Sequence, residues 1–388
     1  MKKINLYIFM MCFMVALNLV SCSVIKLTKQ IKPQATDWVQ YGGSHLRTNY
    51  SKIELTPPLV PVWEYDAEAG FGPYSVTASD SILFVGNLRG DLHLVDIQSG
   101  KKIKKQKFGT AIPGAVALTT GAAYIALLNN SKTLGKFDLL NGKFEWTINA
   151  GQIETAPLLY GNQVFVASLE GKLSAINART GILNWEFVSA KKNVKPMRSA
   201  PATDGNIVVV GSDDGTLYAV DIDNGNLKWK FKTDKSIFSS PSIVGNAVVF
   251  GSLDGYYYCV DITDGNLIWK KNFSAPIFSS QAVSDSFVYA GSSDGMLRCL
   301  DITDGREKWS FKAHSNFYAA PIISGNILYI GSLDKKLYAI DIHTGNLVWS
   351  YLMRGRIKSS PVIWGGYLFV LTDNQIVTAF VESIKELK

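Results

Sequence analysis

The sequence contains little cysteine: four residues in 388, two of which lie within the first 22. The other two, Cys259 and Cys299, occupy the same place in successive copies of a repeated motif, and Ala175, Ala219 and Ala339 fill that place elsewhere. Equivalent positions in stacked sheets lie roughly 10 Å apart, beyond the ~7 Å Cα separation that a disulfide allows. We therefore expect no disulfide and predict that both thiols are small apolar fillers.

The sequence also lacks signatures of catalysis, metal binding and nucleic-acid binding. Its four histidines show no ligand spacing, no G-x-S-x-G nucleophile elbow occurs, and its Asp-Gly turns lack the ligand density of a calcium loop. The formal net charge of +7 is mild for this length and comes without dense basic clusters interleaved with aromatics. We expect no catalytic site, no metal and no nucleic-acid partner.

The first 22 residues have the features of a targeting segment. A positively charged start precedes an apolar stretch from Ile4 to Val20, which ends in Leu-Val-Ser-Cys. This end resembles the bacterial lipobox, so we expect a signal peptide over residues 1–21, lipidation of Cys22 and a lipidated tether over residues 22–52. Ser23 favours the outer membrane, by resemblance to enterobacterial sorting. The alternative is an ordinary signal peptide or membrane anchor that contains a cysteine.

A repeat of about 40 residues occupies the rest of the chain. A glycine-turn element, GSLDG in its clearest form, recurs eight times at steps of 40 to 44 residues. Short apolar runs within each repeat are rich in β-branched and aromatic residues, as strands are, and no segment shows sustained helical periodicity. Proline beside small residues, as in Ser239-Ser240-Pro241, indicates an innermost strand next to a central channel. Four strands per repeat predict a β-propeller blade.

A tryptophan marks the outer strand of nearly every repeat, and Lys104 stands where one repeat should have it. We expect each indole to wedge against the neighbouring blade. These tryptophans are Trp63, Trp146, Trp185, Trp229, Trp269, Trp309 and Trp349. The first precedes every glycine turn, and the last repeat lacks an outer strand, so residues 61–67 should complete the last blade and close the ring. The sequence predicts an all-β, eight-bladed propeller with four-stranded antiparallel blades over residues 53–388.

The unit from Tyr218 to Trp229 resembles the tryptophan-docking repeat A-x-D-x-x-T-G-x-x-x-W of the pyrroloquinoline-quinone (PQQ) propeller superfamily. The stretch from Asp37 to Ser51 also resembles the opening of proteins in this superfamily. Its quinoprotein dehydrogenases carry an adjacent cysteine pair and hold calcium through Glu, Asn and Asp. This chain has no such pair and no candidate calcium ligands. The resemblance therefore implies a non-enzymatic member without a cofactor.

Within the superfamily, the chain is similar to the BamB-like lipoproteins, which are scaffold subunits of the outer-membrane β-barrel assembly machine. In that family, a loop ahead of an S-A-P strand carries leucines and an arginine that dock on a periplasmic POTRA domain of the barrel subunit BamA. The resemblance implies partner contacts by Val194, Lys195, Met197 and Arg198, where one repeat lengthens to 44 residues. Val194 and Met197 stand roughly where leucines would be, and the loop is shorter just before S-A-P. The expected protein is a monomer within a complex, facing the periplasm at the outer membrane.

The sequence leaves alternatives for the function and for the roles of two lysine-rich stretches. The chain could instead be a generic envelope propeller that binds polysaccharide or another envelope protein, or a PQQ-dependent dehydrogenase. The stretch from Lys101 to Lys107 contains five lysines in an expected outer hairpin. It is either solvated loop charge or a surface that docks on an acidic partner or on membrane headgroups. The same alternatives apply to the long loop with Lys191, Lys192, Lys195 and Arg198.

Overall fold

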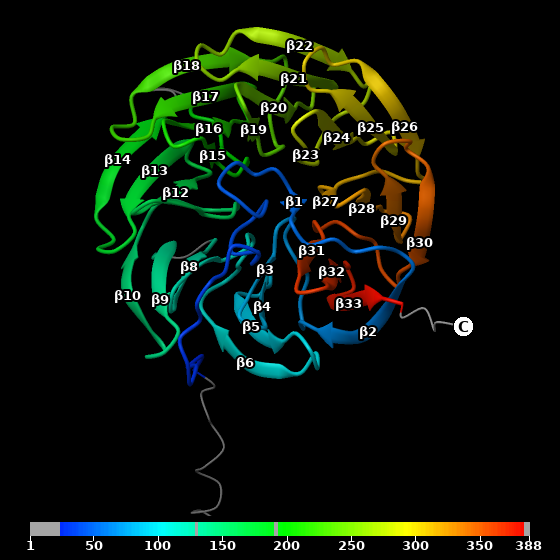
Figure 1. Cartoon of the computed structure of the whole chain (residues 1–388). Helices are drawn as coiled ribbons and strands as arrows, with labels where there is room; N and C mark the ends of the chain where they lie inside the picture. The colour runs from blue at the N-terminus through cyan, green and yellow to red at the C-terminus, as the bar shows by residue number, and fades with distance from the viewer. Residues whose placement is uncertain (1–23, 129–130, 190–192, 384–388) are drawn as a thin grey trace, which may run out of the picture.

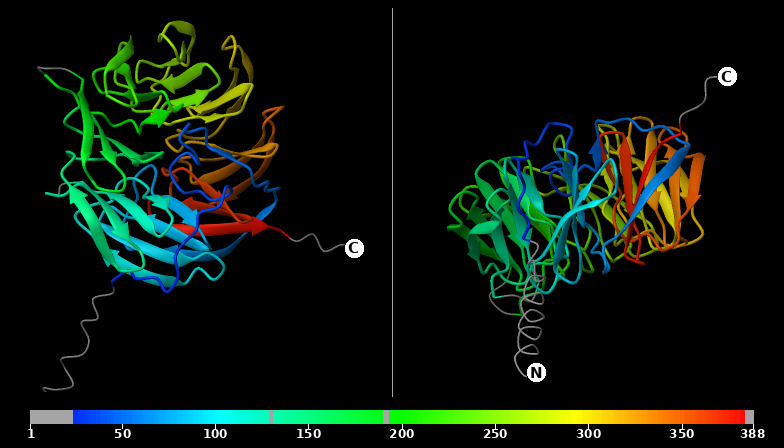
Figure 2. Two further views of the ribbon diagram at one scale, coloured as in Figure 1. Left: turned by 60° about the vertical axis from the view of Figure 1, so that its left-hand side comes forward. Right: turned by 90° about the horizontal axis from the view of Figure 1, so that it is seen from below.

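The computed structural model describes residues 24–128, 131–189 and 193–383, and it confirms the all-β, eight-bladed propeller (Figure 1). Eight sheets surround a central axis, and in seven of them four antiparallel strands follow in sequence order from the axis to the rim. Two further views show the same ring of blades turned and from below (Figure 2). The described part of the chain contains no helix with the length and apolar character that a membrane span needs.

The first four blades each use four consecutive strands. From inner to outer they are β3 (Val76–Ser79), β4 (Ile82–Gly86), β5 (Asp91–Asp96) and β6 (Lys102–Lys107); β7 (Ala117–Thr119), β8 (Ala122–Ala126), β9 (Leu134–Asp138) and β10 (Lys143–Ile148); β11 (Leu158–Tyr160), β12 (Gln163–Ala167), β13 (Lys172–Asn177) and β14 (Leu183–Val188); β15 (Ala202–Thr203), β16 (Ile207–Gly211), β17 (Thr216–Asp221) and β18 (Leu227–Lys232).

The next three blades follow the same plan, and the eighth takes its outer strand from the start of the chain. They are β19 (Ser242–Val244), β20 (Ala247–Gly251), β21 (Tyr256–Asp261) and β22 (Leu267–Asn272); β23 (Ala282–Val283), β24 (Phe287–Gly291), β25 (Met296–Asp301) and β26 (Glu307–Lys312); β27 (Ile322–Ser324), β28 (Ile327–Gly331), β29 (Lys336–Asp341) and β30 (Leu347–Leu352); β31 (Val362–Trp364), β32 (Tyr367–Leu371), β33 (Ile376–Glu382) and β2 (Leu59–Asp66). A short strand, β1 (Tyr50–Ser51), pairs in parallel with β27.

The burial pattern explains the two kinds of strand. All five residues of β20 are buried, because each blade packs face to face with a neighbour on both sides. In the outer strand β22 only Trp269 is buried, and most of the other residues are exposed, since the strand lies at the rim. A continuous apolar run therefore marks a middle strand, and a mixed run marks an outer one.

The indoles join neighbouring blades. In blade five, a β-bulge in the β21–β22 pairing lies directly beside Trp269, which pairs with Cys259. The Trp269 Nε1 group donates a 2.8 Å hydrogen bond to the carbonyl of Ile302 in the next blade, and the indole lies over Gly305. The same bond to the next blade is made by Trp63, Trp146, Trp185, Trp229 and Trp309. Trp349 instead packs on Tyr351 and Phe380.

The ring closes between the beginning and the end of the propeller. The strand β2 pairs antiparallel with β33, from Leu59 opposite Glu382 to Asp66 opposite Ile376, and Figure 1 shows the two side by side. The prediction that residues 61–67 complete the last blade is confirmed, although the strand begins at Leu59 and ends at Asp66. This pairing removes two open sheet edges.

The segment before β2 packs on the ring. The sequence assigned residues 22–52 to a tether, yet residues 37–49 cross one mouth of the channel and meet every blade. The contacts are Trp38 with Ala78, Val39 O with Leu118 N (2.8 Å), Gln40 Oε1 with Leu159 N (3.0 Å), His45 O with Thr203 N (3.0 Å), Leu46 O with Ile243 N (3.0 Å), Thr48 O with Val283 N (2.9 Å), Asn49 O with Ile323 N (3.0 Å) and Asp37 Oδ1 with Trp364 Nε1 (2.6 Å).

Arg47 anchors this segment at the axis. Its side chain is fully buried and donates hydrogen bonds to the carbonyls of Pro201 (3.0 Å), Pro157 (3.2 Å) and Tyr41. Burial lowers the pKa of Arg47 to about 10, so the guanidinium stays charged at neutral pH. The Tyr41 ring in turn contacts the Tyr74 ring, with centroids 3.8 Å apart. One mouth of the channel is therefore filled by the chain itself.

The same segment replaces the missing tryptophan of the first blade. Where other blades direct an indole at the next blade, Lys104 is exposed. The backbone amide of Leu27 donates a 2.7 Å bond to the carbonyl of Leu139, which stands where Ile302 accepts from Trp269. A Cβ on Gly142 would come within 2.8 Å of Val24, much as one on Gly305 would meet Trp269. The start of the described chain thus occupies the place of an indole.

Candidate functional site

The open mouth of the channel is lined by one residue from each blade. Each stands just before the start of an inner strand, and from Arg198 onward the positions recur every 40 residues. They are Pro73, Pro113, Glu154, Arg198, Phe238, Phe278, Tyr318 and Lys358. Together with Phe71, Tyr74, Leu88 and Leu128 they line a cavity of about 450 Å³, which we call the cup.

Small residues behind this ring let the inner strands approach closely. The amide of Ala200 donates a 3.0 Å bond to the Ser240 hydroxyl of the next blade, and the amide of Ser240 donates a 2.8 Å bond to Ser280. Ala320 repeats the bond with Ser360 at 3.1 Å. The repeated serines therefore link neighbouring blades, which explains their recurrence without catalysis.

The cup has an apolar arc on one side. The Phe238 and Phe278 ring centroids are 6.1 Å apart, and the Phe278 and Tyr318 rings stack at 5.0 Å. All three side chains are only partly buried. Aromatic rings at such positions offer rigid contact area, as interface residues do.

Arg198 forms the polar end of this arc. Its guanidinium pairs with Glu154 at 3.1 Å and with Asp213, and lies 5.8 Å from the Phe238 ring centroid. Burial raises the pKa of Asp213 to about 6 and outweighs the opposing effect of Arg198. The Arg198 side chain is 36% exposed, so a partner at the cup could still contact it.

The other residues expected in this loop lie in different environments. Val194 and Lys195 are exposed beside the Gly171 turn. Met197 is fully buried and packs in the cluster that includes Leu158 and Phe165, so its side chain is not available to a partner. Cys22, Lys191 and Lys192 lie outside the described residues.

Reasoning from the sequence found Arg198 but missed its companions. The signal was present, because Arg198, Phe238, Phe278, Tyr318 and Lys358 each precede two small residues at steps of 40. A position that repeats in spacing but varies in residue type, beside positions that hardly vary, indicates a surface presented by the scaffold.

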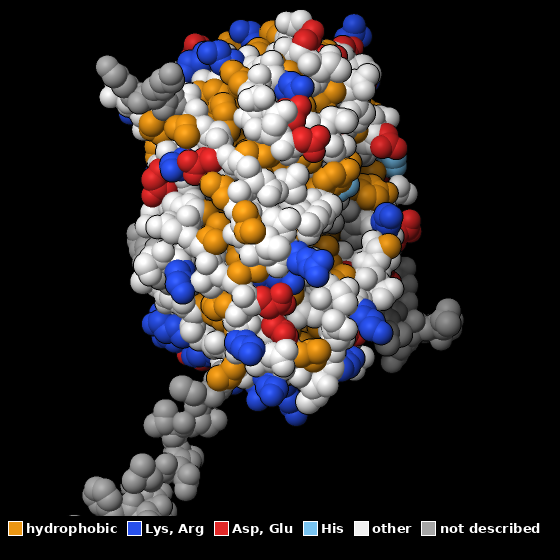
Figure 3. Space-filling view, turned by 90° about the vertical axis from the view of Figure 1, so that its left-hand side faces the viewer, with side chains coloured by type: hydrophobic (Ala, Val, Ile, Leu, Met, Phe, Trp, Pro, Cys, Tyr) orange, Lys and Arg blue, Asp and Glu red, His pale blue; other side chains and the backbone are white. Residues whose placement is uncertain are grey.

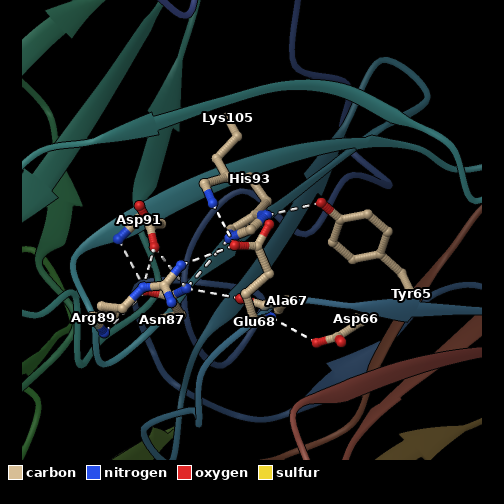
Figure 4. Close-up of polar contacts among 9 residues, drawn as sticks. All are labelled: Tyr65, Asp66, Ala67, Glu68, Asn87, Arg89, Asp91, His93 and Lys105. Atoms are coloured by element: carbon tan, nitrogen blue, oxygen red, sulfur yellow. Dashed lines mark hydrogen bonds and ion pairs between the residues drawn. The ribbon is translucent and has the colours of Figure 1, made fainter. Parts of the chain in front are cut away.

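A second polar cluster lies where the ring closes, between β2 and the first blade (Figure 4). Glu68 pairs with Arg89 at 2.8 Å and with Lys105 at 2.6 Å. The buried His93 shares a 2.8 Å hydrogen bond with the Tyr65 hydroxyl through Nδ1. Burial lowers the pKa of His93 to about 4, so the imidazole is neutral at pH 7. Each of these groups forms a hydrogen bond or an ion pair with another member of the cluster, which links the first blade to the last.

The residues present do not fit the calcium–quinone pair used by dehydrogenases of this superfamily. The carboxylate of the cup, Glu154, already pairs with Arg198, and Tyr41 and Tyr74 are both buried and in ring contact. Within the part of the chain that the structure describes, no group of three or more His, Cys, Asp or Glu side chains is placed to hold a metal.

The comparisons with known structures agree on the fold. BamB from Moraxella catarrhalis is 17% identical and superposes with a TM-score of 0.71, covering 83% of this chain and 99% of its own. The computationally designed Ika8 protein gives 18% identity and a TM-score of 0.71 over 85% and 98%. Quinohemoprotein alcohol dehydrogenase from Comamonas testosteroni gives 15% and 0.75 over 91% and 82%. At such identities, these likenesses show the propeller alone.

A search of curated protein sequences gives no match. The family model for outer membrane protein assembly factor BamB, however, matches residues 88–310 and 231–383. These two overlapping matches span well over half of the sequence, from the first blade after β4 to the end of the last blade. The chain therefore belongs to the BamB family of outer membrane protein assembly factors, within the PQQ-like propellers.

Proposed function

We propose that this chain is a non-enzymatic lipoprotein scaffold that assists the assembly and insertion of β-barrel outer-membrane proteins through protein–protein contacts. It would be anchored by a lipid on Cys22 to the outer membrane and face the periplasm, as a monomer within a complex. The family match supports a role in the cell envelope. The partner would be the POTRA domain of a BamA-like barrel subunit, or another envelope protein.

The observation that carries this proposal is the exposed surface around Arg198. Three partly buried aromatic rings lie next to a partly exposed arginine, and Val194 and Lys195 extend the surface outward. Arginine and aromatic residues dominate the energetic centres of protein interfaces. The inner strands behind this surface are held together by hydrogen bonds between neighbouring blades, such as those from Ala200 to Ser240 and from Ser240 to Ser280.

The test is co-purification of the full chain from detergent-solubilised membranes. The Arg198→Ala variant should lower recovery of the barrel subunit about tenfold or more, since losing an interface anchor typically costs upwards of 1 to 2 kcal/mol. Arg356→Ala is the matched control. Arg356 pairs with Asp373 at 2.6 Å, as Arg198 pairs with Asp213, but it is not among the residues that line the cup.

Equal recovery with both variants would contradict the docking role of Arg198. Recovery of no barrel subunit with the unaltered chain would contradict the scaffold function itself. Binding of glycans by the purified chain, blocked by Phe278→Ala, would instead favour the generic envelope propeller. That second function draws support from the stacked pair of Phe278 and Tyr318, because aromatic faces also bind sugars.

A further inference from the structure

The outer strand of the first blade carries a row of exposed lysines that the proposed function does not use. Its sequence is KIKKQK, without an acidic residue. We call its exposed lysines, Lys102, Lys104 and Lys107, together with the exposed Lys101 just before the strand, the basic edge. Lys105 is set apart, because it pairs with Glu68 at the ring closure. Among the described residues, no ion pair joins a carboxylate to any member of the basic edge.

Lysines on outer strands have an ordinary role, which is to prevent sheet edges from pairing with other chains. On two other outer strands, one such lysine pairs with a carboxylate. Lys228 pairs with Asp221 at 2.9 Å, and Lys308 pairs with Asp301 at 3.1 Å. On β6, none of Lys102, Lys104 and Lys107 has such a pair among the described residues, and Lys101, just before the strand, has none either. Figure 3 shows Lys and Arg side chains gathered along the lower rim of the ring on this side.

The start of the described chain is bonded to this same strand. The amide of Ile25 donates a 2.8 Å bond to Gln106 Oε1 in β6, and the amide of Leu27 bonds to Leu139. Cys22 precedes Ile25 by three residues, so covalent geometry limits it to about 11 Å from that point. This reach is similar to the Debye length of ~10 Å in 0.1 M salt. A membrane that holds Cys22 therefore lies close to the part of β6 that contains Gln106 and Lys107.

We propose that the basic edge contacts anionic phospholipid headgroups of the membrane to which the N-terminus is attached. The inference rests on the membrane attachment proposed above. Acyl chains supply the anchor, and the lysines add an attraction that depends on lipid charge. Because Ile25 and Leu27 fix the chain against β6, the contact also sets the orientation of the ring. The first blade faces the membrane, and the rest of the ring extends away from it.

The test uses the full chain, purified from membranes and reconstituted on vesicles. One set contains phosphatidylcholine alone, and the other an equimolar mixture with phosphatidylglycerol. Amine labelling read by mass spectrometry should show Lys102, Lys104 and Lys107 reacting at least about threefold more slowly on the anionic vesicles, with reversal in high salt. Lys230 and Lys232 on the outer strand of blade four should react equally on both sets.

Variants give an independent readout in a full chain carrying Cys22→Ser, which cannot be lipidated. Its ratio of partitioning between anionic and neutral vesicles isolates the charge contribution. The triple change K102Q/K104Q/K107Q should lower this ratio at least about tenfold, because each lysine near an anionic surface contributes severalfold. The matched change K228Q/K230Q/K232Q removes the same charge from β18 and should alter the ratio less than about twofold.

Equal effects of the two triple changes, or equal labelling of the β6 lysines on both vesicle sets, would overturn the proposal. Protection on neutral and anionic vesicles alike would overturn it too, since lipid charge would then not matter. The mass of the N-terminal peptide distinguishes a failure of the lipid attachment from a failure of the lysine contact. A chain without lipid on Cys22 overturns the attachment and the contact together, whereas a lipidated chain with unprotected lysines overturns the contact alone.

Discussion

At the scale of single residues, the tryptophan of each outer strand limits the size of the side chains beside it. The residue paired with the tryptophan in the middle strand is small in most blades: Ala175, Ala219, Cys259, Cys299 and Ala339. The sequence interpretation of the two cysteines as fillers agrees with their position, since both are buried free thiols beside an indole. The sequence could reveal this role because alanine takes the same place elsewhere.

Two glycines provide a sharp test of the indole contact. Gly265 has φ +74° and a Cβ there would come 2.6 Å from the Trp229 ring, whereas Gly245 has φ +52° with open space around it. Both changes place an alanine at positive φ, which should lower the free energy of unfolding by about 1 to 2 kcal/mol. Only Gly265→Ala also overpacks the indole, so it should cost about 1 to 3 kcal/mol more. Urea unfolding measures the difference, and equal losses would contradict the contact.

His93 makes stability depend on pH in a defined window. Its folded pKa, about 4, lies below the ordinary 6.5, mainly because of burial, with Lys105 and Lys102 opposing Asp91 and Glu68. A depressed pKa means that its contribution is complete above pH 6.5 and is lost as pH falls towards and below 4. The loss amounts to at most about 3 kcal/mol.

The measurement is the free energy of unfolding at pH 7 and at pH 4.5. His93→Gln should be less stable than the unaltered chain at pH 7, and this difference should shrink by about 2 kcal/mol at pH 4.5. His314→Gln alters an exposed histidine and is the control. A constant gap for His93→Gln would show that its protonation does not drive acid destabilisation.

At the scale of elements, the N-terminal segment is where sequence and structure differ most. The strands were predictable because the same sequence pattern recurs in eight repeats. The segment around residues 37–49 contacts all eight blades in succession through different residues, so its sequence contains no repeated pattern from which the contacts could be predicted. The burial of Met197 was not predicted either. Met197 points into the core while its neighbour Arg198 points outward, and the sequence of the loop does not distinguish the two directions. Lys104 was noticed as a departure, but its consequence depended on a contact with residues far away in the sequence.

Lys104→Trp should test the replacement of the missing indole. A tryptophan there would compete with Leu27 for the Leu139 carbonyl and with Val24 for the space over Gly142. Hydrogen exchange of the Leu27 amide should then become at least tenfold faster, a change of about 1.4 kcal/mol in its opening free energy. Lys107→Trp, at an exposed position of the same strand, should leave that exchange rate unchanged. Unchanged exchange in Lys104→Trp would mean that the two groups do not share a site.

At the scale of the whole molecule, the segment across the closed mouth links all eight blades. The sequence predicted their number, their order and the closure by β2, because these follow from counting and from the shifted tryptophan. It did not predict that a second device, centred on Arg47, holds the inner strands together. Nor did it predict the cup, whose residues meet only once the ring is complete.

Arg47→Ala should therefore weaken the whole ring. The change leaves carbonyls without donors and opens a cavity, so we expect a loss of about 3 kcal/mol or more. Hydrogen exchange should accelerate in inner strands of every blade, including those that Arg47 does not touch. Arg354→Ala, which removes an exposed pair with Glu64, should cost less than about 1 kcal/mol. Acceleration confined to β11 and β15 would contradict the linkage of all blades.

The pairing of β2 with β33 also governs when folding can finish. An early strand, with exposed Val60 and Val62, has no partner until nearly the last residue has emerged. Such distant partners close slowly. Throughout synthesis, the nascent chain thus presents an unmatched border that could pair wrongly with another copy. Correct folding therefore depends on keeping the early strand apart from other copies until β33 is available.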